Sequence, residues 1–521
     1  MDRVTRRLVV VSNRLPVSIV KNENGEATVV PGSGGLVTAL SPVLRNRGGI
    51  WIGWPGCNDT PNLDALLNEG GRETGYQLLP VKLSQEEIDG FYVGFSNEVL
   101  WMLFHDFISL CNFEPAYWPV YQRVNEKFAA AIALHTRPDD YIWVHDYHLL
   151  LIAAKLKAQG VKRRTGFFLH TPFPPLDGFL KLPWRGDILE GMLQYDLLGF
   201  QTMRDMRNFI QCARALIPRA RVGTPGSNTL KTVISTARKL FPLGEWEKVD
   251  PVVSLTTPRH QLRVGAFPIS IDFKDFVRRA GKPEVNDEVM RIKGLLPQSK
   301  LVLGIDRLDY SKGIPLRIRA FGEALKTYPE LRGNITLLQV VIPSRLDVER
   351  YQLLKRDIDR LVGEINGRYS EAGWTPVSYL FRALSPRELL AYYRRSDIAL
   401  ITPFKDGMNL IAKEYCACNL DDDGVLILSE FAGAAAQMSA DALLVNPYDV
   451  KGMADAIHRA FHMEVEERRR RMRNLRRSVL EHNIFRWVDN FLTAAIAKQI
   501  KDFPHVKDFI PALHRDTATV A

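Results

Sequence analysis

The chain has 521 residues, of which 46% are hydrophobic and 25% are charged, and this length suits two or three domains of an ordinary globular protein. The composition excludes a disordered protein, and no apolar run approaches the roughly 20 residues that a membrane-spanning helix needs. The net charge of +10 leaves two interpretations open, a nucleic-acid binder or an enzyme that acts on anionic substrates.

The first predicted element is a buried strand at residues 8–11. Its apolar run is too short for the core of a signal peptide and is followed by Ser12-Asn-Arg14, which is no cleavage site, so we expect a cytoplasmic protein. A glycine-rich loop at residues 32–36 would let the backbone approach a ligand closely. The loop lacks the full dinucleotide fingerprint and the Lys-Ser/Thr of a P-loop, so it supports neither a nicotinamide enzyme nor an ATPase.

Short apolar strands alternate with amphipathic helices along the rest of the chain. This alternation predicts parallel sheets with helices on both faces, and we expect a hinge near residues 267–272. The predicted strands are 141–145, 166–170, 197–200, 264–268, 301–305, 335–342, 398–402, 425–429 and 443–446.

Histidines stand at two predicted strand ends. His145 and Asp146 could bind a metal, but no third and fourth ligand stands at a recognisable spacing. His170 ends the next predicted strand, and a lone histidine is more often a satisfied core residue. The five cysteines match no zinc pattern and are expected to be reduced. The sequence therefore predicts no metal site and no cofactor.

Arg307 and Lys312 follow the predicted strand 301–305. Ligands of open α/β sheets bind at the carboxyl ends of strands, and an arginine fork with a lysine point charge suits a pyrophosphate. The alternative for Arg307 is a surface ion pair with Asp306 or Asp309.

Residues 401–414 predict a strand, a tight turn and a helix. The turn carries Asp406 and Gly407, followed by backbone N–H groups at Met408, Asn409 and Leu410 that are expected to attract an anion. Glu414 would then reach a ribose, as acidic residues do in other nucleotide-binding folds. The alternative is an ordinary strand–turn–helix in which Asp406 caps the helix.

The densest run of basic residues lies at 468–473. Val465, Met472, Leu475 and Val479 recur around it at helical spacing. This pattern predicts an amphipathic helix whose charged face is solvated, in preference to a nucleic-acid patch.

Motifs from both ends of the chain match one known family. They are VVSNRLPV, GSGGL, WIGWPG, FSNEVLW, WVHDYHLL, GFFLHTPFPP, LLGFQT, DRLDYSKG, PSR, TPFKDGMNLIAKEY, SEFAGAA and VNPYD. With these the chain resembles the retaining trehalose-6-phosphate synthases, which are nucleotide-sugar glycosyltransferases. Two features depart from the family pattern: Lys405 stands where arginine is more usual, and residues 215–262 form a longer stretch than in the compact bacterial enzymes.

The resemblance implies an α/β GT-B fold of two facing Rossmann-like domains with a cleft between them. Residues 1–270, with a crossover helix in 483–521, are expected to bind the acceptor, and residues 271–482 the nucleotide sugar. The implied reaction moves glucose from a nucleoside diphosphate glucose, expected to be UDP-glucose, to glucose-6-phosphate. Glucosylglycerol-phosphate synthase, which uses glycerol-3-phosphate, is the near rival, and a catalytically silent relative is the rival from another class. We expect no nucleic-acid or membrane partner and leave a homo-oligomer open.

The resemblance also assigns residues to the two substrates. The donor residues are Gly34, Gly35, His170, Arg307, Lys312, Leu384, Leu389, Asp406, Asn409, Leu410 and Glu414. The acceptor residues are Arg14, Trp54, Tyr92, Trp101, Asp146 and Arg345. Of these, Asp146, His170, Arg307, Lys312 and Asp406 are expected to be catalytic. In the family, attack occurs from the front face and the leaving phosphate takes the acceptor proton, so no protein nucleophile is required.

Overall fold

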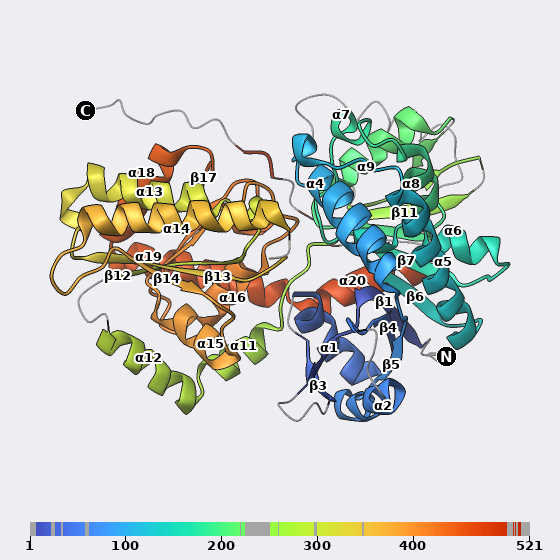
Figure 1. Cartoon of the computed structure of the whole chain (residues 1–521), viewed down its shortest axis with the longest axis horizontal. Coiled ribbons are helices and arrows are strands. Elements are labelled where there is room, and N and C mark those ends of the chain that lie inside the picture. The colour runs from blue at the N-terminus through green and yellow to red at the C-terminus, as the bar shows by residue number, and fades with distance from the viewer. Residues whose placement is uncertain are drawn as a thin grey trace. The chain divides into compact units, whose positions relative to one another are not determined.

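The computed structural model describes residues 7–21, 27–32, 35–57, 62–218, 220–223, 251–258, 260–295, 300–345, 348–497, 504, 506 and 509–511. The chain divides into two compact units. Unit 1 comprises Met1–Asp272 and Asn483–Val506, and unit 2 comprises Phe273–His482 and Lys507–Ala521. Each unit contains a mostly parallel sheet with helices packed on it, so the predicted α/β class is confirmed (Figure 1).

The sheet of unit 1 has nine strands among the described residues. Their order is β5 (Gln77–Pro80), β4 (Ile50–Trp54), β1 (Leu8–Arg14), β6 (Tyr141–His145), β7 (Arg164–Phe168), β8 (Leu197–Phe200), β11 (Gln261–Ala266), β10 (Val252–Thr256) and β9 (Arg221–Gly223). Neighbours from β5 to β11 are parallel, whereas β10 and β9 are antiparallel. The antiparallel edge was not predicted. Only residues 257–260 join β10 to β11, too few for the crossover that parallel neighbours need.

The central strand β1 forms because its valines are β-branched and both of its faces are covered. Val9, Val10 and Val11 are fully buried, and they pair with β4 on one side and β6 on the other. The apolar run that opens the chain is therefore a core strand, as predicted.

Helix α20 (Ile484–Ile496) returns the chain to unit 1. Its Phe491 ring stacks on Trp143 of β6 at 4.4 Å between ring centroids. The Trp487 indole N–H donates to the Phe267 carbonyl at 3.0 Å. Asn483 caps the helix by accepting from the Arg486 N–H. The helix ends at Ile496, well before the end of the predicted crossover segment at residue 521.

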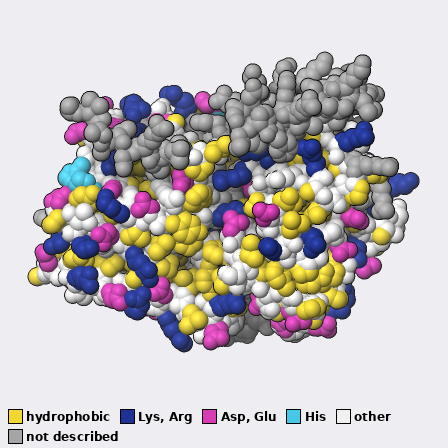
Figure 2. Space-filling view, turned by 90° about the horizontal axis from the view of Figure 1, so that it is seen from above, with side chains coloured by type: hydrophobic (Ala, Val, Ile, Leu, Met, Phe, Trp, Pro, Cys, Tyr) yellow, Lys and Arg dark blue, Asp and Glu magenta, His cyan; other side chains and the backbone are white. Residues whose placement is uncertain are grey.

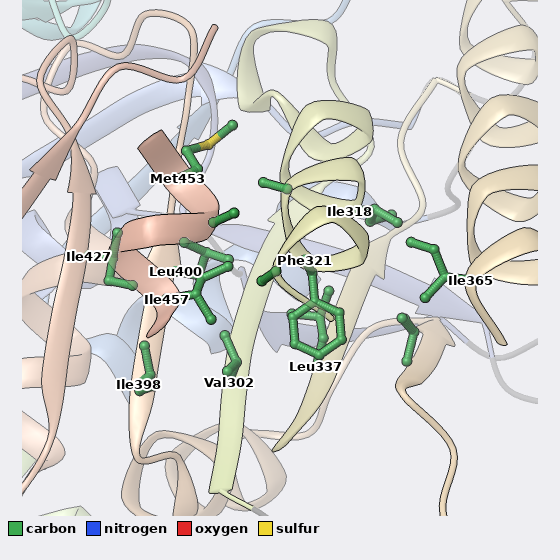
Figure 3. Close-up of a cluster of buried hydrophobic side chains, with 14 of the residues drawn as sticks. Val302, Ile318, Phe321, Leu337, Ile365, Ile398, Leu400, Ile427, Met453 and Ile457 are labelled. Carbon is green, nitrogen blue, oxygen red and sulfur yellow. The ribbon is translucent and has the colours of Figure 1, made fainter. Parts of the chain in front are cut away.

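Unit 2 contains a sheet of six parallel strands. Their order is β14 (Val377–Phe381), β13 (Ile335–Ile342), β12 (Lys300–Arg307), β15 (Ile398–Ile401), β16 (Val425–Ser429) and β17 (Leu443–Val445). Helices α13 (Ile314–Thr327), α14 (Glu349–Tyr369) and α18 (Val450–His462) cover one face, with α15 (Pro386–Arg395), α16 (Leu410–Cys418) and α19 (Val465–Glu481) on the other (Figure 1). Figure 3 shows Phe321 and Ile318 of α13 packed among Val302, Leu337 and Leu400 of the strands.

The arginine-rich segment is helix α19, as predicted. Met472, Leu475 and Val479 are buried, but Val465 is 41% exposed because it is the first residue of the helix. Arg468 pairs with Asp423 at 3.0 Å, and Arg471 pairs with Glu467 at 2.7 Å. Figure 2 shows the same mixing elsewhere, since Lys and Arg side chains alternate with Asp and Glu over the visible face.

None of the five cysteines forms a disulfide, and Cys212, Cys416 and Cys418 are buried. Among the helices of the described segments, none is both long enough and apolar enough to cross a membrane.

Candidate active site

Each sheet has a topological switch point, where successive strands are added in opposite directions. In unit 1 the point lies between β1 and β6, and in unit 2 between β12 and β15. Open α/β sheets bind ligands beyond the carboxyl ends of the strands at such points. Arg14 ends β1 and Asp146 follows β6, whereas Arg307 ends β12 and Asp406 follows β15. The predicted site residues therefore stand where each topology favours a ligand.

In unit 2, Lys312 and Asp406 are in contact, although the sequence assigns the first to the pyrophosphate of the donor and the second to its sugar. Lys312 Nζ lies 2.6 Å from Asp406 Oδ2, and the Asn409 side-chain amide donates to the same oxygen at 3.1 Å. Burial alone would lower the pKa of Lys312, but Asp406, Asp306 and Asp309 outweigh it and raise the pKa. Lys312 is therefore a fixed cation, and its charge lies directly beside the carboxylate of Asp406.

A turn of fixed shape holds Lys312 in this position. The Asp309 carboxylate accepts from the Ser311 N–H at 2.9 Å, and Gly313 has a φ of 64°. A Cβ at Gly313 would overlap the Thr402 carbonyl, so this left-handed turn requires glycine.

A buried ion pair that was not predicted from the sequence lies beneath the turn. Arg317 of α13 is fully buried and lies 2.7 Å from Asp306. It also donates to the Thr402 hydroxyl at 3.0 Å and to the Lys312 carbonyl at 3.2 Å. Asp306 thus pairs with Arg317 and not with Arg307, whose side chain is exposed. The signal that could have revealed Arg317 is a charged residue on the apolar face of α13.

The helix after the turn begins later than predicted. Helix α16 starts at Leu410, and Asn409 is its cap, because the Asn409 side chain accepts from the Ala412 N–H at 3.2 Å. The alternative in which Asp406 caps the helix is therefore wrong. Of the three predicted N–H groups, only that of Leu410 belongs to the helix, whereas Met408 and Asn409 precede it.

The predicted nucleoside residues lie on α15 and α16 or beside them. Glu414 Oε2 accepts from the Tyr393 hydroxyl at 2.9 Å, and burial raises the pKa of Glu414 although Tyr393 opposes the shift. Leu384 precedes α15 and Leu389 lies within it, and both are half-buried.

In unit 1 the predicted acceptor residues begin with a cation over an aromatic ring. The Arg14 guanidinium carbon lies 4.3 Å from the Trp54 ring centroid. Gly56, with a φ of 86°, lies against the guanidinium, and a Cβ there would overlap it. The Trp54 ring meets Tyr92 edge-on at 5.9 Å.

An aromatic row links the remaining acceptor residues. Tyr92 stacks on His148 at 6.0 Å, His148 stacks on Tyr147 at 4.0 Å, and Tyr147 contacts Trp101 at 5.7 Å. Trp54 and Trp101 are 5% and 8% exposed, so each leaves little surface for a ligand. Tyr92 is less buried and lies in the π-helical segment Ile88–Leu100, a geometry that is frequent at functional sites.

His145 and His170 form a hydrogen-bonded pair. His145 Nδ1 and His170 Nε2 are 3.1 Å apart, and Asp146 Oδ1 accepts from the His170 backbone N–H at 3.3 Å. Burial lowers the pKa of His145 well below 6.5 and that of His170 to about 3. Both rings are therefore neutral at neutral pH, and one nitrogen of the pair donates while the other accepts. His170 lies beyond β7, which ends at Phe168 and not at His170 as predicted.

Backbone strain coincides with several predicted site residues. Among the described residues, the non-glycine positions with positive φ include Asp146 at 73°, Arg345 at 51° and Asn409 at 74°. Such conformations cost about 1–3 kcal/mol each and cluster at functional sites. The predicted acceptor, phosphate and donor positions thus each carry a strained backbone.

The remaining predicted residues lie in one unit or the other, except for one that lies outside the described residues. Arg345 is in unit 2, where it donates to the Tyr351 hydroxyl and lies 3.6 Å from Asp309, whereas Arg14 is in unit 1. Gly35 is the first residue of α1 (Gly35–Arg47), and Gly34 lies outside the described residues.

We predict that His145 makes unit 1 less stable in mild acid. The folded state keeps this ring neutral, while the unfolded chain takes up a proton as the pH falls below 6.5. The free energy of unfolding should therefore decrease by up to about 1.4 kcal/mol per pH unit per histidine as the pH falls from about 6.5 to 5. In His145→Gln, the opening free energy that hydrogen exchange of β6 amides measures should depend less on pH. His135→Gln, which alters an exposed histidine, is the control, and an unchanged pH dependence in His145→Gln would contradict the argument.

Comparison with known proteins shows related sequences over nearly the whole chain. A family model for Glycosyltransferase family 20 matches residues 6–497. The trehalose-6-phosphate synthase of Mycobacterium leprae (strain TN) is 42% identical over 496 residues, which cover 95% of each chain. That of Mycolicibacterium smegmatis (strain ATCC 700084 / mc(2)155) is 41% identical over 494 residues, covering 95% of this chain and 93% of the relative.

Solved structures are similar over nearly the whole chain. One is the UDP-forming alpha,alpha-trehalose-phosphate synthase of Burkholderia xenovorans in complex with glucose-6-phosphate, with a TM-score of 0.80, 32% identity and coverage of 94% of this chain and 99% of that chain. Another is a trehalose-6-phosphate structure from E. coli bound with UDP-2-fluoro glucose, with a TM-score of 0.80, 35% identity and coverage of 95% and 99%. The resemblance inferred from the motifs is confirmed, as is the GT-B fold class. The chain belongs to glycosyltransferase family 20.

Proposed function

We propose that this protein moves glucose from UDP-glucose to glucose-6-phosphate and forms alpha,alpha-trehalose-6-phosphate with retention. The observation that carries the proposal is the Lys312–Asp406 pair at the switch point of unit 2, in a chain 42% identical to a trehalose-6-phosphate synthase. The pair sets a cation for a phosphate beside a carboxylate for sugar hydroxyls, which is the combination that a nucleotide sugar requires.

Charged side chains of unit 2 would hold the departing pyrophosphate. Arg307 ends β12 with an exposed side chain, and Lys312 is fixed by Asp406. Together with the N–H groups of Asn409 and Leu410, they would stabilise the negative charge that develops as the bond to the sugar breaks. We propose that these groups suffice without a metal ion or other cofactor.

Three side chains would then fix the nucleoside. Glu414 would accept from the ribose hydroxyls, in place of or beside its bond from Tyr393, and Leu384 and Leu389 would flank the base. Gly34 and Gly35 are proposed to bind the donor through their backbone, as the family motif implies.

The transfer itself needs no protein nucleophile in this scheme. The bond from the anomeric carbon to the UDP oxygen breaks, and the acceptor hydroxyl attacks the same face. Its proton passes to the leaving phosphate oxygen. Asp406 and His170 would hold the transferred glucose, and Asp146 the acceptor. The strained backbone of Asp146 and its bond to the His170 N–H support a fixed position for both residues.

Arginines and aromatic rings would define the acceptor. Arg14 and Arg345 are proposed to bind its phosphate, while Tyr92 and Trp101, with Trp54 behind Tyr92, would wall its sugar. Glycerol-3-phosphate would leave part of an aromatic wall uncovered, and uncovered apolar surface forfeits about 25 cal/mol per Å². This favours glucose-6-phosphate, and the relatives named in the comparisons are trehalose-6-phosphate synthases and not glycerol-phosphate enzymes.

We predict a higher kcat/KM with glucose-6-phosphate than with glycerol-3-phosphate, measured side by side with UDP-glucose and product identification. Arg345→Ala should raise the KM for glucose-6-phosphate by about tenfold or more, because a hydrogen bond to a charged group contributes about 1.5–3 kcal/mol. UDP affinity should change little.

Arg332→Ala is a matched control for that variant. Arg345 lies over the Tyr351 ring at 5.5 Å, and Arg332 lies over the Tyr369 ring at 5.1 Å in the same unit. A preference for glycerol-3-phosphate would reject the acceptor assignment, and wild-type protein without transferase activity would favour a silent relative.

We further propose a cytoplasmic enzyme that binds neither nucleic acid nor membrane. Size-exclusion chromatography with light scattering would determine whether it is a homo-oligomer.

A further inference from the structure

A cluster of metal-ligating side chains lies on the surface of unit 2, apart from the residues assigned to the substrates. His458 and His462 are on α18, and Glu330 is in the short 3-10 helix Pro329–Leu331. Their ligand atoms all lie within 4.8 Å of one another. In Figure 2 exposed histidine side chains (cyan) gather at one place at the edge of the visible surface.

The sequence spacing and the helix packing bring these groups together. Residues four apart on a helix share a face, so His458 and His462 project side by side, with ring centroids 4.6 Å apart. Helix α13 lies beside α18 (Figure 1), and the chain leaving α13 carries Glu330 to the two rings.

The distances fit a metal ion. Glu330 Oε1 lies 2.9 Å from His458 Nε2 and 3.8 Å from His462 Nε2. Ligands of a tetrahedral zinc ion are about 3.3 Å apart, because each lies about 2.0–2.2 Å from the metal. The two observed separations bracket this value and the third pair of ligand atoms lies within 4.8 Å, so side-chain movements would bring the three ligands to one ion.

The orientation of one ligand is already fixed. The His458 ring stacks on Tyr328 at 3.9 Å and 15°. Tyr328 is held in turn, because its hydroxyl donates to Asp455 Oδ1 at 2.8 Å. A simple surface hydrogen bond between His458 and Glu330 would require neither a second histidine nor the stacking of His458 on Tyr328, whereas a metal site would use both.

We propose that Glu330, His458 and His462 bind one divalent transition-metal ion of the zinc, copper or nickel type. Imidazole and carboxylate ligands suit these ions, and three protein ligands leave a position for water. The 14 residues of α13 separate the cluster from the Lys312 turn by about 21 Å. The ion would therefore crosslink the chain after α13 to α18 and take no part in sugar transfer.

The test uses tag-free full-length protein titrated with zinc chloride by calorimetry. We expect one ion per chain and a thermal transition that rises with zinc. In the double variant with His458→Ala and His462→Ala, affinity should fall by more than about tenfold, since loss of even an outer-shell partner costs that much. Glu330→Gln should also weaken binding. Copper(II) electron paramagnetic resonance should show two nitrogen ligands in the wild type and none in the double variant.

His482→Ala is the control, because His482 is also in unit 2 and bonds instead to the Ser478 carbonyl. It should bind zinc like the wild type, and turnover without zinc should be the same in all of these proteins. The proposal would be overturned if the wild type did not bind zinc stoichiometrically. It would also be overturned if the double variant still bound zinc, which is the result expected if cysteine thiols were the ligands.

Discussion

Asp406→Asn is expected to reduce turnover by about ten- to a hundredfold while the affinity for UDP persists. The substitution removes a charge-assisted hydrogen bond to the transferred sugar, which contributes about 1.5–3 kcal/mol. It also removes the carboxylate that lies 2.6 Å from Lys312 Nζ, so the lysine loses its fixed partner. UDP lacks the sugar, and its binding by calorimetry should change less than turnover. Wild-type turnover would reject the role of Asp406.

Two further variants separate the sugar contact from the phosphate contact. Arg307→Ala should weaken UDP binding as well as turnover, because Arg307 is proposed to act on the pyrophosphate that UDP retains. Asp423→Asn is the control for charge loss, since Asp423 pairs with Arg468 and precedes β16 at the amino end of the sheet. If all three variants lose activity to the same extent, the loss comes from unit 2 as a whole and not from the site.

Arg317→Ala is expected to lower the free energy of unfolding of unit 2 by about 3–5 kcal/mol, because it leaves a buried carboxylate without its partner. Arg317 is fully buried and 2.7 Å from Asp306, itself 2% exposed. Burial already raises the pKa of Asp306, and Arg317 opposes that shift. Hydrogen exchange of β12 and α13 amides in urea would measure the loss in this unit alone.

The buried pair has an exposed counterpart that serves as a control. Lys451 and Asp455 are 2.7 Å apart but 76% and 41% exposed, so Lys451→Ala should lower the free energy of unfolding much less than Arg317→Ala does. The double variant Arg317→Ala with Asp306→Leu should be more stable than Arg317→Ala alone, because no charge is left unpaired. Equal effects of Arg317→Ala and Lys451→Ala would show that the buried pair does not stabilise the unit.

Most strands buried on both faces were predictable because their apolar runs are continuous, although β4, which is buried at every position, was not predicted. The predicted limits of β6, β8, β13 and β16 agree with the structure at both ends. The edge strand β14 was missed, since four of its five residues are only half-buried and its pattern is weaker. The antiparallel edge of unit 1 was missed as well, because it depends on the length of one connection.

Some residues of the donor site could also be predicted from local sequence pattern. Arg307, Lys312 and Asp406 follow strands, and position after a strand can be read from local pattern. Arg317 could not be found by that rule, because it lies inside a helix and acts on residues of a neighbouring turn. The helix start at Leu410 was misplaced because the cap was assigned to Asp406, whereas the Asn409 side chain makes the capping bond.

The sequence by itself determined the class of fold, the family and the residue types at the site, since each depends on local patterns and short motifs. Only the tertiary structure decided which of these groups act on one another. Lys312 and Asp406 are 94 positions apart, and Glu330 and His458 are 128 apart, yet each pair is within hydrogen-bonding distance. Contacts of this kind follow from strand order and helix packing, which arise from burial of apolar surface over a whole unit. The spacing of the polar residues along the chain does not show which of them will be brought together.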